Sequence, residues 1–195
     1  MERNRRDLKS LRANISMVKY DSRIRADEKY QGNVLYMPAS GRNAYVRLDW
    51  QSPVRETLAV ADGEYTLFRP RLNTAYRGKS ASFGGKNNKA SGMLEFLNMS
   101  GSQVKARFEP VQDIYDETLW GGVQTTHFKL VPKGGASYKY AEIWVDGSGM
   151  PIQTKVVEKN DDATTVRLTN VQKNAGLSTD EFKLKLDGKV KIVKS

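Results

Sequence analysis

Apolar and polar residues alternate with a period of two along most of the chain, and this pattern predicts β-strands. It is clearest at residues 45–50, where valine, leucine and tryptophan alternate with tyrosine, arginine and aspartate. Similar alternation recurs in the segments 58–60, 65–68, 128–130, 143–145, 152–156 and 166–168. Because successive side chains of a strand point to opposite faces, each segment is expected to bury one face and expose the other.

Short turn signals separate these segments and indicate antiparallel strands. An Asp-Gly pair at 62–63 is a strong hairpin signal, and an Asp-Gly pair at 146–147 and an Asp-Asp pair at 161–162 interrupt the later strands. Connections this short join antiparallel neighbours, whereas a parallel crossover needs about a dozen residues or more. The sequence therefore predicts a mainly antiparallel sheet.

Three segments depart from the alternation and are expected to be helical. Residues 2–14 carry leucines at positions 8 and 11 among charged residues, a narrow apolar stripe that must lie on a larger element. Residues 90–99 are too apolar on both faces for an exposed helix, and they follow a Gly- and Asn-rich segment, 83–89, that is expected to be a mobile loop. Residues 178–181 are expected to form one helical turn, capped by Ser178 or Thr179.

Composition favours one globular domain over residues 1–195 and excludes several kinds of site. Hydrophobic residues make up 38% of the 195, enough for a core, and no apolar run approaches the roughly 20 residues of a spanning helix. Because the chain has no cysteine, disulfides, thiolate zinc sites and cysteine nucleophiles are excluded. The polar N-terminus shows no signal-peptide pattern, so we expect a cytosolic protein or one whose signal has been removed.

The formal net charge of +10 suits contact with phosphates, whether on nucleic acids or on anionic lipids. The basic residues are spread along the chain, however, and a solvated basic surface is the simpler interpretation. Aromatic and basic residues interleave over residues 65–77, a pattern that can stack the bases of a single-stranded nucleic acid. The same residues are ordinary on a solvent-facing strand, so no nucleic-acid partner is predicted.

Residues that often carry catalysis or metals are few and poorly arranged. His127 is the only histidine and sits in a predicted strand, a poor basis for a catalytic triad or a metal site. Residues 73–80 approach a phosphate-binding loop but lack its first glycine and the helix that should follow. The carboxylates at 113, 116 and 117 lack the ligand spacing of a calcium loop. No catalytic residue, metal or cofactor is predicted, and the chain is expected not to be an enzyme.

Methionines and large apolar residues gather near the apolar segment 90–99. Met37, Met93, Met99 and Met150 have soft, adaptable side chains that suit irregular apolar ligands, although core packing explains each of them singly. A helix that is apolar on both faces, beside a glycine-rich loop, can cover an open sheet. The cavity beneath such a helix would be apolar and largely preformed.

Three segments, in a fixed order, resemble a known family. They are LKSLRANISMVKYDSRI, QSPVRETLAVADGEYTLFRPRLNTAYRG and AEIWVDGSGMPIQTKVVEKNDDATTVRLTNVQKNAGLSTDEFKLKLDGKVKIV. The middle segment shows a proline, an alternating strand, an Asp-Gly turn, an aromatic strand and a second proline. Together the segments resemble the bacterial outer-membrane lipoprotein carriers, the LolA/LolB-like family, over most of the chain.

The resemblance implies an α+β, mainly antiparallel fold, in which a half-open β-barrel wraps over a few helices around an apolar cavity. It also implies a periplasmic lipoprotein carrier or lipid-binding protein that shields acyl chains during transfer to the outer membrane, with its signal peptide removed. The residues expected to line the cavity or its lid are Leu35, Met37, Leu48, Trp50, Leu58, Met93, Phe96 and Leu97. A lid shift at Gly84-Gly85 would release the cargo.

The same resemblance implies basic residues at the cavity rim and particular partners. Arg42, Arg47 and Arg77 are candidates for a lid tether or for steering a headgroup, although the proline precedes the arginine near Arg42, the reverse of the family's order. The expected partners are an acylated lipoprotein or lipid and, transiently, envelope membrane proteins, with the chain itself a monomer. The alternative is a lipid-sensing regulatory module that acts through a protein partner, because a shared fold does not settle function.

Overall fold

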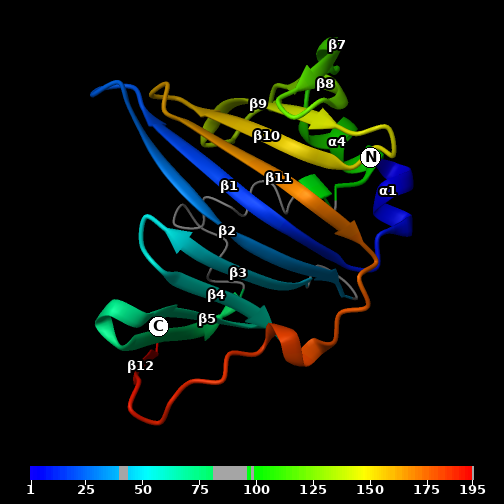
Figure 1. The fold of residues 1–195 in the computed structure, drawn as a ribbon. Helices are drawn as coiled ribbons and strands as arrows, with labels where there is room; N and C mark the ends of the chain where they lie inside the picture. Colours follow the sequence, from blue (N-terminus) through cyan, green and yellow to red (C-terminus); the bar gives the residue numbers. More distant parts are fainter. Residues whose placement is uncertain (40–43, 81–95, 98, 195) are drawn as a thin grey trace. The chain divides into compact units, whose positions relative to one another are not determined.

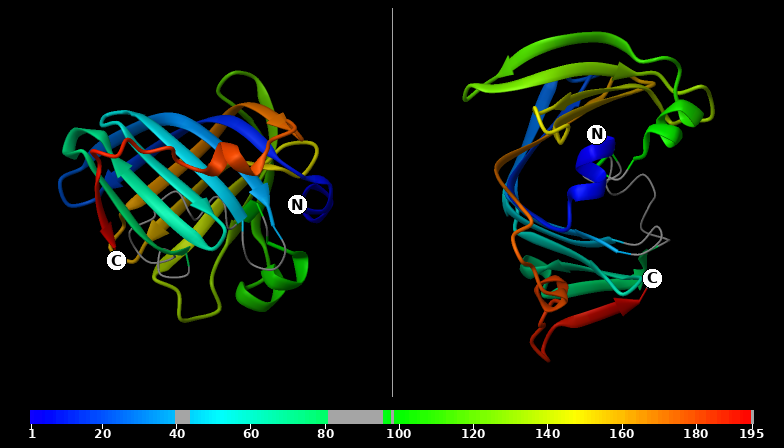
Figure 2. Two further views of the ribbon diagram at one scale, coloured as in Figure 1. Left: turned by 90° about the horizontal axis from the view of Figure 1, so that it is seen from below. Right: turned by 90° about the vertical axis from the view of Figure 1, so that its right-hand side faces the viewer.

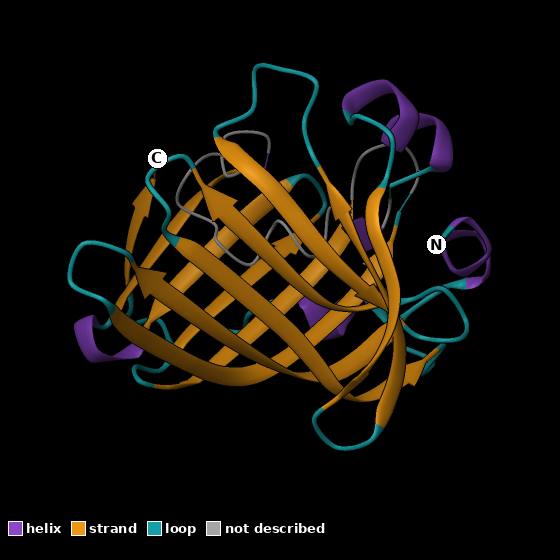
Figure 3. Ribbon diagram, turned by 90° about the horizontal axis from the view of Figure 1, so that it is seen from above, coloured by secondary structure: helices purple, strands orange, loops and turns teal. Residues whose placement is uncertain are grey.

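A computed structural model describes residues 1–39, 44–80, 96–97 and 99–194. Strands dominate these residues and helices are short, as Figure 1 and Figure 3 show. The elements are α1 (Glu2–Asp7), β1 (Leu11–Asp21), β2 (Ala26–Pro38), β3 (Ala44–Ser52), β4 (Glu56–Ala61), β5 (Glu64–Arg69), η1 (Pro70–Leu72), β6 (Thr74–Lys79), α4 (Gly101–Arg107), β7 (Gln112–Leu119), β8 (Val123–Leu130), β9 (Tyr138–Val145), β10 (Pro151–Glu158), β11 (Ala163–Lys173), η2 (Thr179–Phe182) and β12 (Lys191–Lys194). Within this described part of the chain, no helix is long and apolar enough to cross a membrane.

The strands hydrogen-bond in the order β12-β6-β5-β4-β3-β2-β1-β11-β10-β9-β8-β7. β12 pairs with β6 in parallel, and the registers from β2 to β6 and from β7 to β11 are antiparallel. Because β12 and β7 stand at the two ends of this order, the sheet is not closed. The prediction of an α+β fold with a mainly antiparallel, incompletely closed sheet is confirmed.

The chain divides into two compact units. The first contains Met1–Asp7, Met17–Lys29 and Lys89–Leu168, and the second contains Leu8–Ser16, Tyr30–Asn88 and Thr169–Ser195. The long strands β1, β2 and β11 contribute residues to both units. A single domain over residues 1–195 stays a prediction.

In the second unit, the hairpin from β4 to β5 follows the predicted turn. Asp62 and Gly63 both have positive φ, of 52° and 79°, as the two central residues of a type I′ turn require. Figure 2 shows the C-terminal segment, orange to red, passing through η2 and ending in β12. β12 then pairs with β6, where Ile192 and Ala75 are register partners.

In the first unit, β7 to β11 form consecutive antiparallel pairs around a hydrophobic core. The core consists of Phe96, Met99, Phe108, Leu130, Ala141 and Ile143. α4 begins after Ser100, whose hydroxyl accepts the Gln103 N–H while the Gln103 side chain accepts the Ser100 N–H, as in a capping box. Asp161, at a φ of 68°, turns β10 into β11 where the sequence predicts a turn.

β7 is an end strand of the sheet and contains a β-bulge. Its register against β8 shifts between Gln112 and Tyr115, and Asp113 has a φ of 50°. Both faces of β7 are largely exposed. Ile114 is 66% exposed, and Trp120 in the turn to β8 is 87% exposed. The sequence pattern did not predict this strand, because polar residues occupy both of its faces and no alternation results.

The predicted N-terminal helix is wrong beyond Asp7. α1 ends at Asp7, and a strand, β1, begins at Leu11. Exposed or half-buried residues of β1 alternate with the buried side chains of Leu11, Ala13, Ile15 and Met17. Leu8 and Leu11 therefore do not share one helical face, and their spacing of three positions only imitates a helical repeat.

The helix predicted over residues 90–99 lies mostly outside the described residues, as do the loop at 83–89 and Gly84-Gly85. Of that segment, Phe96, Leu97 and Met99 are described and buried; Phe96 and Leu97 are helical, and Met99 is not. The helical turn predicted at 178–181 is confirmed as η2, which follows Ser178. Residues 73–80, which approach a phosphate loop in sequence, contain the strand β6 instead.

Candidate functional site

In the second unit, β2 to β5 present an apolar face, defined by two rows of side chains that cross the strands. One row consists of the successive register partners Val34, Leu48, Leu58 and Leu67. The other row consists of Tyr36, Val46, Val60 and Tyr65. Since register partners of antiparallel strands project from the same face, these eight side chains form one continuous apolar surface. Val60 and Leu67 are half-buried, and the other six are buried.

Aromatic and charged side chains stand at one end of the apolar face. Trp50 is half-buried and packs edge-on against Tyr30, with ring centroids 5.7 Å apart. Its register partner is Glu56, which accepts a hydrogen bond from Arg69 Nε at 2.7 Å. The Arg69 guanidinium also lies over the ring of Tyr76, 5.5 Å from the centroid. This end therefore combines apolar surface with groups that form hydrogen bonds.

The residues predicted to line a cavity divide between the two faces of these strands. Leu48, Trp50 and Leu58 lie together on the side of the apolar face. Leu35 and Met37 project from the opposite face, because Leu35 pairs with Arg47 in the strand register. Arg77 is also on that opposite face, in a row that contains Leu35, Arg47, Ala59, Thr66 and Arg77.

The predicted lid residues are in the first unit or outside the described residues. Phe96 belongs to the core of the first unit, where its ring centroid lies 6.5 Å from that of Phe108. Leu97 is buried in the same unit. Met93 and Arg42 lie outside the described residues. The roles of Met93, Phe96 and Leu97 in a lid, and of Arg42 as its tether, stay predictions.

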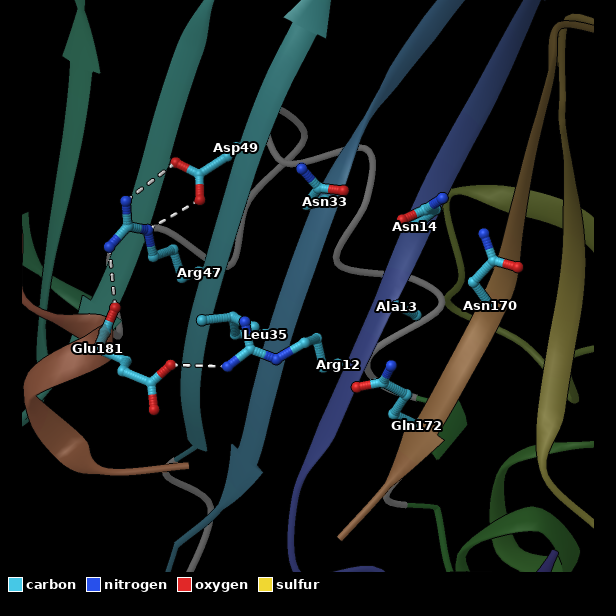
Figure 4. Close-up of a pocket in the computed structure, with 10 residues that line it drawn as sticks. All are labelled: Arg12, Ala13, Asn14, Asn33, Leu35, Arg47, Asp49, Asn170, Gln172 and Glu181. Carbon is cyan, nitrogen blue, oxygen red and sulfur yellow. Dashed lines mark hydrogen bonds and ion pairs between the residues drawn. The ribbon is translucent and has the colours of Figure 1, made fainter. Parts of the chain in front are cut away.

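A polar cleft of about 510 Å³ lies within the second unit (Figure 4). It is lined by Arg12, Ala13, Asn14, Asn33, Leu35, Arg47, Asp49, Asn170, Gln172 and Glu181. The strands β11, β1, β2 and β3 form its floor, and η2 supplies Glu181 beside β3. The cleft therefore lies on the face that carries Arg47, opposite the apolar face.

The two guanidinium groups of the cleft are each paired with a carboxylate. Arg12 Nη2 lies 2.8 Å from Glu181 Oε2. Arg47 donates two hydrogen bonds to the Asp49 carboxylate, of 2.8 and 3.4 Å, and a third to the Glu181 carbonyl oxygen at 3.0 Å. Thr57 Oγ1 donates to Asp49 at 2.9 Å. The side-chain charges of the cleft are therefore balanced within it.

Two contacts fix η2 so that Glu181 faces the cleft. The Ser178 N–H donates to Glu181 Oε1 at 3.1 Å, which caps the turn. Phe182, the next residue, is fully buried, and its ring centroid lies 5.6 Å from that of Tyr45 on β3. An apolar anchor and a polar cap thus hold adjacent residues of the same turn.

Acidification is expected to release Glu181 from its partners. The Ser178 N–H and the Arg12 guanidinium hold the pKa of Glu181 below its ordinary value of 4.5. A carboxyl with a lowered pKa stabilises the fold above its unfolded pKa, and this effect is lost as the pH falls through the folded value. The amide NMR signals of residues 178–183 should therefore shift below a pH of about 4.5. Glu181→Gln should remove this transition, and a transition that persists in the variant would assign it to another group.

The single histidine is a packed side chain of the first unit. His127 is 1% exposed and lies between the rings of Tyr115 and Trp144, at centroid distances of 4.3 and 4.7 Å. Its Nδ1 is 2.9 Å from the Asp113 carbonyl oxygen, and its Nε2 is 3.4 Å from Glu142. Among the residues that the structure describes, no group of three or more histidine, cysteine or acidic residues could hold a metal ion. We interpret His127 as a structural residue that holds β7 to the neighbouring strands.

Most of the polar cleft was not predicted from the sequence, which singled out only Leu35 and Arg47 of its lining. A signal for Arg12 and Asn14 was present, because both alternate with the apolar residues of β1. No comparable signal exists for Glu181, which meets Arg12 across 169 positions of the chain.

Residues 101–185 match the family model described as outer membrane lipoprotein carrier protein LolA. The resemblance of the chain to this family is confirmed by that match, and with the open antiparallel sheet it confirms the predicted LolA-like fold class. The family description is that of a carrier and names no reaction. No curated protein matches the chain.

Several solved structures share the fold at low sequence identity. An uncharacterized conserved protein from Thermus thermophilus aligns with a TM-score of 0.63 at 10% identity, over 99% of this chain and 95% of that one. The Pseudomonas aeruginosa MucA/MucB complex gives a TM-score of 0.56 at 12% identity, over 98% of this chain and 61% of that one. LprF from Mycobacterium bovis gives 0.53 at 9% identity, over 91% of this chain and 92% of that one.

Proposed function

We propose that this chain, with its LolA-like fold, is a periplasmic carrier or binding protein that shields acyl chains of a lipoprotein or lipid on its apolar face. The observation that carries the proposal is the pair of apolar rows across β2 to β5. On β2 and β3, the opposite face lines the polar cleft. The match of residues 101–185 to a family of lipoprotein carriers supports it. Transfer to the outer membrane would use this shielding, and no catalytic step is part of the proposal.

The apolar face suits reversible binding of one acyl chain. Each methylene removed from water contributes about 0.8 kcal/mol, so about ten of them contribute about 8 kcal/mol before the cost of ordering the ligand is subtracted. A ligand contacts the half-buried side chains Trp50, Val60 and Leu67 with less disturbance of the core than the fully buried ones. Acyl binding should therefore be most sensitive to substitution at these three positions.

Leu67→Gln is expected to weaken binding of a fluorescent fatty acid about tenfold. The bound acyl chain would cover the new amide and leave it without a hydrogen-bond partner, which lowers the binding free energy by about 1–3 kcal/mol. Fluorescence titration of the whole chain measures the change. Thr66→Gln is the matched control, since Thr66 is the neighbouring residue of β5, is equally half-buried and projects from the opposite face. The control should bind the probe as the unsubstituted chain does.

Mass spectrometry of the freshly purified chain, before and after lipid extraction, provides a second measurement. A carrier of acyl chains should retain lipid through purification and release it on extraction. If the unsubstituted chain holds no lipid and takes up no fluorescent fatty acid, the proposal is wrong. Equal weakening in the Leu67 and Thr66 variants would also contradict it, because it would place the ligand away from the apolar face.

A regulatory module that senses lipid through a protein partner is the second candidate. It is favoured by the exposed apolar side chains of Ile114 and Trp120 on the β7–β8 hairpin, which suit a protein contact. The similarity in fold to MucB, which is described in complex with MucA, is consistent with this role. A stable envelope partner, whose affinity for the chain changes when lipid is added, would favour the module over the carrier.

A further inference from the structure

The polar cleft and the apolar face share the strands β2 and β3 but lie on opposite faces of them. On β3, Leu48 projects from one face, whereas Arg47 and Asp49 project from the other. On β2, Val34 and Asn33 divide in the same way. Because the backbone of the sheet separates the two faces, an acyl chain on the apolar face does not reach the cleft. Any ligand of the cleft would therefore be distinct from the acyl chain.

The charged side chains of the cleft are occupied by one another. Arg12 pairs with Glu181, and Arg47 pairs with Asp49 and with the Glu181 carbonyl oxygen. Two guanidinium groups and two carboxylates leave no net charge for a phosphate or a metal cation to neutralise. The ligand that fits this composition is polar and uncharged.

Four amide side chains of the cleft have no hydrogen-bond partner within the described part of the chain. They are Asn14 on β1, Asn33 on β2, and Asn170 and Gln172 on β11, and all four are exposed. Figure 4 shows Asn33, Asn14 and Asn170 side by side across the three strands. Each amide offers two donors and an acceptor oxygen, and adjacent strands lie about 4.8 Å apart. The cleft thus presents donors and acceptors at a regular spacing.

A saccharide fits these groups better than an extended peptide does. Peptides that join a sheet do so by main-chain pairing at an edge strand, but β2, β1 and β11 each have a strand on both sides. Their main-chain groups are therefore engaged, and only side chains are offered to a ligand. Hydroxyl and acetamido groups of a sugar both donate and accept hydrogen bonds, as the amides do. We propose that the cleft binds a neutral oligosaccharide through Asn14, Asn33, Asn170 and Gln172.

Calorimetric titration of the whole chain tests the proposal with two probes, a linear oligomer of N-acetylglucosamine and a linear oligomer of glucose. At least one should bind. The triple variant Asn14→Ala, Asn33→Ala, Gln172→Ala should bind that probe at least about tenfold more weakly, because several hydrogen bonds are lost. Its melting temperature should match that of the unsubstituted chain, since these amides have no partner in the described residues. Gln51→Ala removes an exposed amide of β3 outside the cleft and should leave the affinity unchanged.

Failure of both probes to bind, or equal binding by the triple variant, would overturn the proposal. An uncharged extended peptide that binds more tightly, with the same dependence on the three amides, would also overturn it and assign the cleft to peptides. Leu67→Gln should retain saccharide binding while it weakens acyl binding. The saccharide proposal and the acyl-chain proposal can therefore fail independently.

Discussion

Gly32→Ala is expected to destabilise the second unit by about 3 kcal/mol, at the upper end of the usual cost of overpacking. A Cβ atom at this position would overlap the carbonyl oxygen of Asp49 and would lie 3.0 Å from the Cα of Trp50. Both are main-chain atoms of β3, which the β2–β3 register holds opposite Gly32. Because main-chain atoms cannot rotate away as a side chain can, the two strands must separate locally.

Urea denaturation, followed by circular dichroism, measures this loss as a lower midpoint. Gly147→Ala is the matched control, because its added Cβ meets no heavy atom within 4 Å and the residue is exposed in the turn after β9. The free energy of unfolding of the control should change by less than about 1 kcal/mol. Equal midpoints for the two variants would contradict the steric explanation.

Phe182→Ala is expected to cost about 3 kcal/mol and to detach η2 from β3. Phe182 is the only buried residue of η2, and its ring packs against Tyr45. Local unfolding of the C-terminal segment would remove the cavity that the substitution leaves. The free energy of that local unfolding is therefore the upper limit of the cost. Once η2 opens, Glu181 leaves Arg12 and Arg47, and the cleft loses one of its walls.

Hydrogen exchange measured by mass spectrometry distinguishes local opening from global destabilisation. In Phe182→Ala, peptides that cover residues 175–185 should lose protection before those that cover β3 and β4. Thr179→Ala changes an exposed residue of the same turn and should alter stability by no more than about 0.5 kcal/mol. Full protection of η2 in Phe182→Ala would show that its polar contacts hold it without the aromatic anchor.

The alternation of residue types located β3 to β5 and β8 to β11, but it missed β7 and the start of β1, and it assigned side chains to faces only where it was clean. Residues 45–50 alternate, and the sequence correctly placed Leu48 and Trp50 on one face and Arg47 on the other. Residues 34–36 of β2 are apolar without interruption, and all three are buried. A run that is buried on both faces carries no period, so the face of Leu35 could not be predicted.

The polar cleft depended on contacts that no local pattern contains. Of its four strands, alternation predicted β3 and β11, whereas the part of β1 that carries Arg12 and Asn14 was expected to be helical. Which strands are neighbours is decided by hydrogen bonding across the chain. β1 and β11 are adjacent although about 150 positions separate them. The wall of the cleft that η2 forms depends on Phe182. The few residues of one helical turn do not reveal that Phe182 is buried. Local patterns therefore predicted some of the elements, and tertiary pairing produced the site.

The bulge in β7 affects whether a second copy of the chain can pair with this end of the sheet. An end strand with a regular main chain is a template on which a strand of another molecule can grow. The left-handed backbone of Asp113 and the register shift from Gln112 to Tyr115 interrupt this template. Asp113, Asp116 and Glu117 add negative charge along it. We expect the bulge to keep the exposed side chain of Ile114 off a regular strand template, so a chain without the bulge should offer a better edge for cross-β aggregation.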